Sequence, residues 1–143
     1  MMQSSGAAVV VQAVVYGNRD DQSGCGVLCT RNPSTGQNLI TGEYLTSTEG
    51  DEVVDGRHRA LSLEELRLCS VAEGSAFKGS TIYDSLVYFA QKLETHFRDI
   101  QDVEFTVQNG VLFLLECSAA RRSAKAAVKV CVDMAKEGII TGK

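Results

Sequence analysis

The segment from Ile100 to Cys117, IQDVEFTVQNGVLFLLEC, constrains the fold more than any other part of the chain. Two runs rich in β-branched and aromatic residues flank the dipeptide Asn109-Gly110, which is typical of tight hairpin turns. The pattern predicts a mostly buried β-hairpin. Three carboxylates interrupt it, at Asp102, Glu104 and Glu116, so the same hairpin is a candidate for a functional site.

The length of the hairpin loop decides which residues share a face of the sheet. A two-residue turn at Asn109-Gly110 would pair Gln108 with Val111 and would mix acidic and core residues on both faces. A three-residue loop from Gln108 to Gly110, with Gly110 left-handed, pairs Val107 with Val111 instead. We expect the three-residue loop, because one face is then wholly apolar: Val103, Phe105, Val107, Val111, Phe113 and Leu115.

In that register the three carboxylates gather on the opposite face. Asp102 lies across from Glu116, and Glu104 is their diagonal neighbour, within roughly 5–8 Å. Because like charges that face each other destabilise a sheet, the cluster requires a compensating cation. Oxygen ligands at variable spacing suit Mg²⁺, Mn²⁺ or Ca²⁺, and Mg²⁺ takes its remaining ligands from water and nucleotide phosphates. The alternative is a solvated face neutralised by Arg121 or Arg122.

Periodicity predicts the remaining strands and a first helix. Runs of β-branched and apolar residues indicate strands at residues 7–16, 24–30 and 38–46, and a short helix is expected over residues 62–68. Residues 82–97 carry apolar side chains at helical spacing, which predicts an amphipathic helix. Thr81 and Asp84 are spaced to form a capping box at its N-terminus.

A second helix is expected after the hairpin and should end at Gly138. Its predicted buried stripe is Ala124, Ala127, Val128, Cys131 and Ala135. The order of elements, strands then helix then hairpin then helix, predicts an α+β fold, in which helices pack on one face of a mainly antiparallel sheet.

Composition limits the classes of partner. A chain of 143 residues is expected to form one domain, and its net charge of −4 disfavours nucleic acid as a partner. No apolar run is long enough to span a membrane.

The five cysteines include no CxxC pair, which argues against a zinc site or a disulfide framework and favours reduced thiols. The run AAVVVQAVVY is not preceded by Lys or Arg, so no targeting signal is visible and a cytoplasmic or organellar interior is expected.

Four blocks of the sequence are similar to consecutive blocks of one enzyme family. TRNPSTGQ, GEYL, HFRDIQDVEFTVQNG and RRSAKAAVKVCVDMAKEGIIT resemble pyruvate phosphate dikinase, in its N-terminal nucleotide-binding region of ATP-grasp type. The resemblance extends from about Gly6 to Thr141. It implies that residues 1–143 form a single domain, the C-terminal lobe of an ATP-grasp nucleotide-binding domain, and a fragment of a larger multidomain enzyme.

The resemblance also implies an activity. Such enzymes convert ATP, phosphate and pyruvate to AMP, pyrophosphate and phosphoenolpyruvate, with ATP as substrate and Mg²⁺ or Mn²⁺ as cofactor. The expected partners are ATP and the remaining dikinase domains: a first ATP-grasp lobe, a phosphohistidine domain and a pyruvate-binding barrel. The lobe alone is expected to be inactive. The alternative is a degenerate regulatory or interaction module that keeps the ATP-grasp fold without its chemistry.

The resemblance assigns roles to individual residues. Gln12 is expected near the nucleotide base, Glu43 and Asp51 near the nucleotide, and Arg31 near a phosphate. The metal on ATP would be held by three acids: Asp102, Glu104 and Glu116. Two positions depart from the family pattern, since Glu116 replaces a glutamine and Ser118 replaces an arginine associated with phosphoryl transfer. The loss of the arginine is expected to weaken catalysis by this site, because positive donors stabilise the transferring phosphoryl group.

Overall fold

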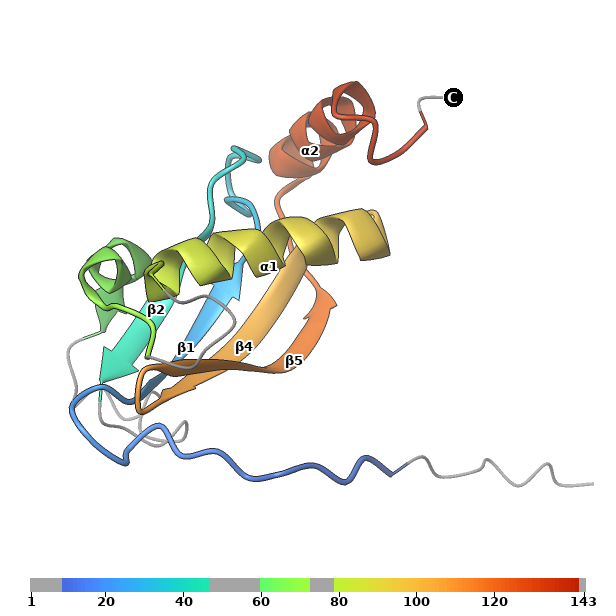
Figure 1. Cartoon of the computed structure of the whole chain (residues 1–143). Helices are drawn as coiled ribbons and strands as arrows, with labels where there is room; N and C mark the ends of the chain where they lie inside the picture. Colours follow the sequence, from blue (N-terminus) through green and yellow to red (C-terminus); the bar gives the residue numbers. More distant parts are fainter. Residues whose placement is uncertain (1–8, 47–59, 73–78, 142–143) are drawn as a thin grey trace, which may run out of the picture.

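The strands form one antiparallel sheet, in the order β3-β2-β1-β4-β5 (Figure 1). The computed structural model describes residues 9–46, 60–72 and 79–141. Within them the strands and helices are β1 (Gly24–Cys29), β2 (Thr41–Thr46), β3 (Leu61–Ser62), η2 (Leu63–Leu68), α1 (Ile82–Phe97), β4 (Gln101–Gln108), β5 (Val111–Ala119) and α2 (Ala124–Lys136). The predicted α+β fold with a mainly antiparallel sheet is confirmed.

Helix α1 lies across one face of the sheet, and η2, a 3-10 helix, packs beside it (Figure 1). The predicted capping box is present: the amide of Asp84 donates to Oγ1 of Thr81 at 3.1 Å, and the amide of Thr81 donates to Oδ2 of Asp84 at 3.1 Å. The main core lies between this face and the helices. Its buried side chains include Leu28, Val103 and Val107 from the sheet and Leu63, Leu66, Ile82 and Leu86 from the helices.

Two aromatic rings stack across the central strand of the sheet. Gly26 in β1 is paired with Tyr44 in β2 on one side and with Phe105 in β4 on the other. The two rings are nearly parallel, at an interplanar angle of 3° and a centroid distance of 6.0 Å, and both are buried. A Cβ atom at Gly26 would lie 2.4 Å from Cζ of Phe105, so only glycine leaves room for this contact. Gly26 therefore has a packing role.

Helix α2 packs at the end of the sheet, in a second cluster with Cys29, Ile100 and Ala120 (Figure 1). The helix ends before Gly138, as expected. Its predicted buried stripe is wrong, because Val128 is 68% exposed and Cys131 is also exposed. The buried positions are Ala126, Val130 and Met134. The helix carries Ala and Val on two faces, so periodicity alone did not determine which face is covered.

The strand predicted for residues 7–16 is wrong over its described part, residues 9–16. These residues form no helix or strand, and Val11 is 93% exposed. Strand β1 pairs with β2 on one side and with β4 on the other, so this segment cannot form a hairpin strand next to β1. Strand β2 also begins later than expected, at Thr41.

The hairpin turn differs from the three-residue loop that we expected. Asn109 and Gly110 both have positive φ, 51° and 71°, and Gln108 pairs with Val111, so the connection is a two-residue turn. The extra residue that separates the two faces lies instead within β5. The register shifts between Glu104 and Phe105, which leaves Leu115 without a partner as a β-bulge.

We predict that Gly26→Ala destabilises the fold by about 1–3 kcal/mol, because the added methyl group overpacks the stacked rings. Urea unfolding of the two proteins measures the difference. The penalty should shrink when Gly26→Ala is made in a Phe105→Leu background, where the contacting ring is gone. An equal penalty in both backgrounds would show that the stacked ring is not its cause.

Candidate functional site

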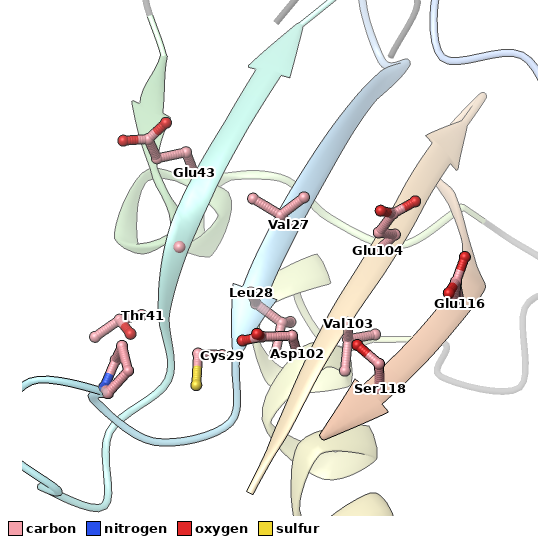
Figure 2. A pocket seen from close by; sticks show the side chains of 12 residues that line it. Val27, Leu28, Cys29, Thr41, Glu43, Asp102, Val103, Glu104, Glu116 and Ser118 are labelled. Atoms are coloured by element: carbon pink, nitrogen blue, oxygen red, sulfur yellow. The ribbon is translucent and has the colours of Figure 1, made fainter. Parts of the chain in front are cut away.

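A cavity of about 470 Å³ lies on the face of the sheet opposite α1, a volume typical of small-molecule sites (Figure 2). Side chains alternate along a strand, and Val103 and Phe105 of β4 pack into the core beneath α1. Asp102 precedes Val103, and Glu104 lies between Val103 and Phe105. Both carboxylates therefore point to the other side. The cavity is lined by Val27, Leu28, Cys29, Pro33, Thr41, Gly42, Glu43, Asp102, Val103, Glu104, Glu116 and Ser118.

The bulge at Leu115 brings β5 into the site. Leu114, before the bulge, packs against the core, and so does Cys117, after it. Because side chains alternate along the strand, Glu116, next to Cys117, points to the cavity. Glu116 consequently pairs with Glu104. The predicted pairing of Asp102 with Glu116 is wrong, because it assumed a three-residue loop and a regular ladder, whereas the predicted placement of all three carboxylates on one face is confirmed.

The strand registers arrange the lining side chains in two parallel rows (Figure 2). In the first row Glu43 pairs with Val27, Val27 with Glu104, and Glu104 with Glu116, across four strands. This row places two carboxylates next to each other and a third on the far side of one apolar side chain. Glu43 is exposed, and Val27 is 48% exposed.

The second row runs two residues away along each strand. Thr41 pairs with Cys29, Cys29 with Asp102, and Asp102 with Ser118. It adds one carboxylate and two hydroxyl groups to the acids of the first row. Sequence inspection alone missed Thr41 and Cys29, because their place in the site depends on the register between β1, β2 and β4.

No cation balances the acids of the first row among the described residues. Of the salt bridges there, none reaches Glu43, Glu104 or Glu116, and no Lys, Arg or His lines the cavity. Arg122 is one of the two arginines considered as a neutralising group. It instead donates to the Asp99 carboxylate, just beyond the C-terminal end of α1, through its two terminal nitrogens, Nη1 and Nη2. Neutralisation of the acidic face by Arg122 is therefore wrong.

The donor set is composed of hard oxygen ligands. Carboxylates and hydroxyls suit Mg²⁺, Mn²⁺ or Ca²⁺. Within the described ranges, however, no three acidic, histidine or cysteine side chains come close enough to hold one ion together. A metal bound at this wall would take one or two protein carboxylates and complete its coordination from water or a ligand, which is the usual arrangement for Mg²⁺.

Cys29 is a buried thiol at the floor of the second row. Burial, followed by the neighbouring Asp102 carboxylate, raises the pKa of Cys29 to about 11. The thiol is therefore protonated at neutral pH, and it lacks the thiolate character of a nucleophile. Its contribution to the cavity is a small, neutral surface.

The other residues assigned by the resemblance lie outside the cavity. Gln12 is exposed in the segment 9–16, and it is not among the lining residues. Arg31 is completely buried and binds Glu94 and Glu137, so it faces two carboxylates and no open space. Asp51 lies outside the described residues.

The chain is similar over 135 residues, 94% of its length, to pyruvate, phosphate dikinases. It is 42% identical to the chloroplastic enzyme of Mesembryanthemum crystallinum and to dikinase 2 of Oryza sativa subsp. japonica, and 40% identical to the chloroplastic dikinase 1 of Zea mays. The chain spans only 13–14% of the length of these relatives. No family model matches it. The resemblance to a segment of these dikinases is confirmed.

Among the described helices, none is both long enough and apolar enough to cross a bilayer.

We predict that Glu116→Gln stabilises the fold by about 0.2–1 kcal/mol, because it removes the repulsion between directly opposed carboxylates. Urea unfolding at low and high salt measures the change, and the gain should shrink as salt screens the charges. The control is Glu43→Gln, since Val27 separates Glu43 from the nearest acid of its row. Equal gains from the two variants would contradict repulsion within the Glu104–Glu116 pair.

Proposed function

We propose that this chain, a homologue of one segment of the pyruvate, phosphate dikinases, is a lobe that binds ATP together with a divalent metal in the cavity beside β1, β2, β4 and β5. The observation that supports this most directly is the arrangement of the two lining rows. Four carboxylates from three strands face one cavity, and no basic side chain lines it among the described residues. We infer that residues 1–143 act as the C-terminal lobe of an ATP-grasp domain.

Electrostatics makes the metal essential to this proposal. A triphosphate carries several negative charges, and it is repelled by a wall that also carries four carboxylates. A divalent ion removes that repulsion, because it binds carboxylate and phosphate oxygens together. Of the three proposed metal-binding acids, the directly paired Glu104 and Glu116 would hold the Mg²⁺ or Mn²⁺ itself, and Asp102 in the next row would bind the water ligands of the ion.

The first row also suggests how the rest of a nucleotide is accommodated. Val27 offers a half-exposed apolar surface between the paired acids and Glu43. The carboxylate of Glu43 accepts hydrogen bonds, so it suits the hydroxyl or amino groups of a nucleotide whose phosphates lie at Glu104. The phosphate role expected for Arg31 is unsupported by this geometry, because both sides of its guanidinium group are already bound to carboxylates.

As part of a longer protein, the lobe would serve the dikinase reaction, in which ATP, phosphate and pyruvate give AMP, pyrophosphate and phosphoenolpyruvate. A first ATP-grasp lobe, a phosphohistidine domain and a pyruvate barrel would be its partners. The cavity itself lacks a described positive donor aimed at a phosphoryl group, and such donors supply much of the rate enhancement in phosphoryl transfer. The chain alone is therefore proposed to bind ATP weakly and to leave it unconverted.

A second candidate function rests on one residue. Ser118 lines the cavity where the family pattern has an arginine. A module that kept the fold and lost nucleotide chemistry, and now binds a protein partner, fits that change. It predicts that Mg²⁺ and ATP together leave the melting temperature unchanged.

Calorimetric titration with ATP in the presence and absence of Mg²⁺ tests the leading proposal. Binding should require the metal, and Glu104→Gln and Asp102→Asn should each weaken it at least about tenfold, or about 1.4 kcal/mol. Asp99→Asn removes a carboxylate outside the cavity and is the matched control.

Three results would count against the proposal. Unchanged affinity in both cavity variants would remove the hairpin from the site, and equal binding without Mg²⁺ would remove the metal. The absence of any binding or thermal shift would favour the interaction module. Separately, formation of AMP from ATP by the pure chain would contradict its inactivity.

A further inference from the structure

The loop between β1 and β2, residues 30–40, is fastened along the whole length of α2. At the N-terminus of the helix, the amide of Ser123 donates to the carbonyl oxygen of Pro33 at 3.0 Å, and its hydroxyl donates to that of Ser34 at 2.9 Å. Along the first two turns, Gly36 lies so close that a Cβ atom there would be 2.9 Å from the carbonyl oxygen of Ala126 and 3.0 Å from Cβ of Lys129. The loop and the helix therefore form one unit.

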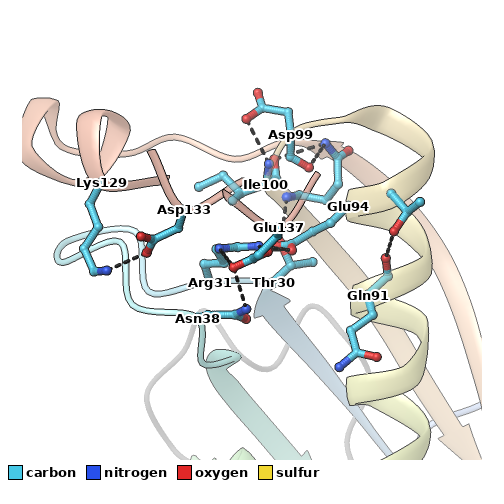
Figure 3. Close-up of polar contacts among 12 residues, drawn as sticks. Thr30, Arg31, Asn38, Gln91, Glu94, Asp99, Ile100, Lys129, Asp133 and Glu137 are labelled. Atoms are coloured by element: carbon cyan, nitrogen blue, oxygen red, sulfur yellow. Dashed lines mark hydrogen bonds and ion pairs between the residues drawn. The ribbon is translucent and has the colours of Figure 1, made fainter. Parts of the chain in front are cut away.

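Arg31 attaches this unit to the rest of the molecule (Figure 3). Its Nε and Nη2 atoms donate to the Glu94 carboxylate of α1 at 3.0 and 2.9 Å. Its Nη1 and Nη2 atoms donate to the carboxylate of Glu137, at the C-terminal end of α2, at 3.1 and 2.6 Å. The side chain of Arg31 has no exposed surface, and that of Glu94 is 5% exposed. One guanidinium group thus joins two helices and the loop.

The chemistry of arginine suits this position. Its planar guanidinium group binds two carboxylates at once, which the single ammonium of lysine does not match. Burial acts to lower the pKa of Arg31, but the hydrogen bonds that it donates to Glu94 and Glu137 outweigh burial and hold that pKa above its usual range. The cation is therefore permanent, and the two carboxylates compensate its burial.

The same loop forms one wall of the cavity. Pro33 follows Arg31 by two residues, and its carbonyl oxygen accepts the hydrogen bond from Ser123 of α2. It lines the cavity together with Thr41, where the loop joins β2. Cys29 lies immediately before the loop, and it is buried in one cluster with Val130 and Met134 of α2. A change in the position of α2 would move the Pro33 wall and uncover Cys29.

We propose that Arg31 is a positioning residue: by clamping Glu94 and Glu137 it sets the place of the Pro33 wall and so tunes the affinity of the cavity for its ligand. The ligand in question, ATP with Mg²⁺, rests on the proposed function above. Arg31 itself does not contact the ligand, and it acts through the loop that it holds.

Glu137→Gln is the variant that tests the clamp. The side chain of Glu137 is 36% exposed, so the amide is solvated and Arg31 keeps Glu94 as a partner. Two readouts are measured on the folded protein: the dissociation constant for ATP with Mg²⁺, and the rate at which iodoacetamide labels Cys29, followed by mass spectrometry of its peptide. Affinity should fall roughly 2- to 30-fold, as for other residues that act without ligand contact, and Cys29 labelling should accelerate.

Two controls separate positioning from a general loss of stability. Asp133→Asn makes the same chemical change on α2, where it breaks the surface pair with Lys129. Val71→Ala truncates a buried side chain of the main core, away from the clamp. Measured well below their melting temperatures, both should keep the affinity and the slow Cys29 labelling of the original chain. Arg31→Lys should behave like Glu137→Gln.

The outcomes distinguish this inference from the proposed function. If Glu137→Gln binds ATP with Mg²⁺ as tightly as the original chain, the clamp does not tune the cavity and the inference is overturned. If the original chain does not bind this ligand, the proposed function fails, and the clamp is judged by Cys29 alone. Faster labelling in Glu137→Gln but not in Asp133→Asn then supports a wall held by Arg31, and equal rates overturn it.

Discussion

The pairing of β1 with both of its neighbours is the constraint on which the core and the cavity depend. On the helical side of β1, Gly26 leaves space in which Tyr44 and Phe105 stack over the strand. On the other side, Val27 and Cys29 occupy the centres of the two rows that line the cavity. A slip of one residue in either ladder would turn side chains to the opposite face. The packing of the rings therefore also secures the alignment of the acids.

The charged side chains near the helices also differ from those that line the cavity. The arginines at the helical end are bound to carboxylates there, Arg31 to Glu94 and Glu137 and Arg122 to Asp99. Those ion pairs fasten helix ends and the loop after β1. The acids of the first row, in contrast, have no described cationic partner. Among the described residues, the ion pairs thus compensate charges that support the architecture, and none reaches the acids of the first row.

Local pattern predicted much of this fold from the sequence. The capping box at Thr81, the helix that follows it and the faces of β4 are properties of short segments, and all were correct. The errors concern choices that depend on distant residues. The two-residue turn looked unfavourable because the bulge at Leu115, which restores the two faces, has no signature of its own. The buried face of α2 was decided by its neighbours, which are Gly36 of the loop and the cluster of Cys29, Ile100 and Ala120, and the helix sequence does not reveal them.

The candidate site shows the same limit. The three hairpin carboxylates were predictable, because they share one face of adjacent strands. The alignment of Glu43 with Glu104 and Glu116 across Val27 emerges only from the registers of three strand pairs. This alignment changes the chemical interpretation, since it extends an acidic pair into a row with an apolar centre. A bare cation needs only the pair, whereas a ligand that joins a metal, an apolar surface and a hydrogen-bond donor matches the whole row, and a metal-bound nucleotide has all three.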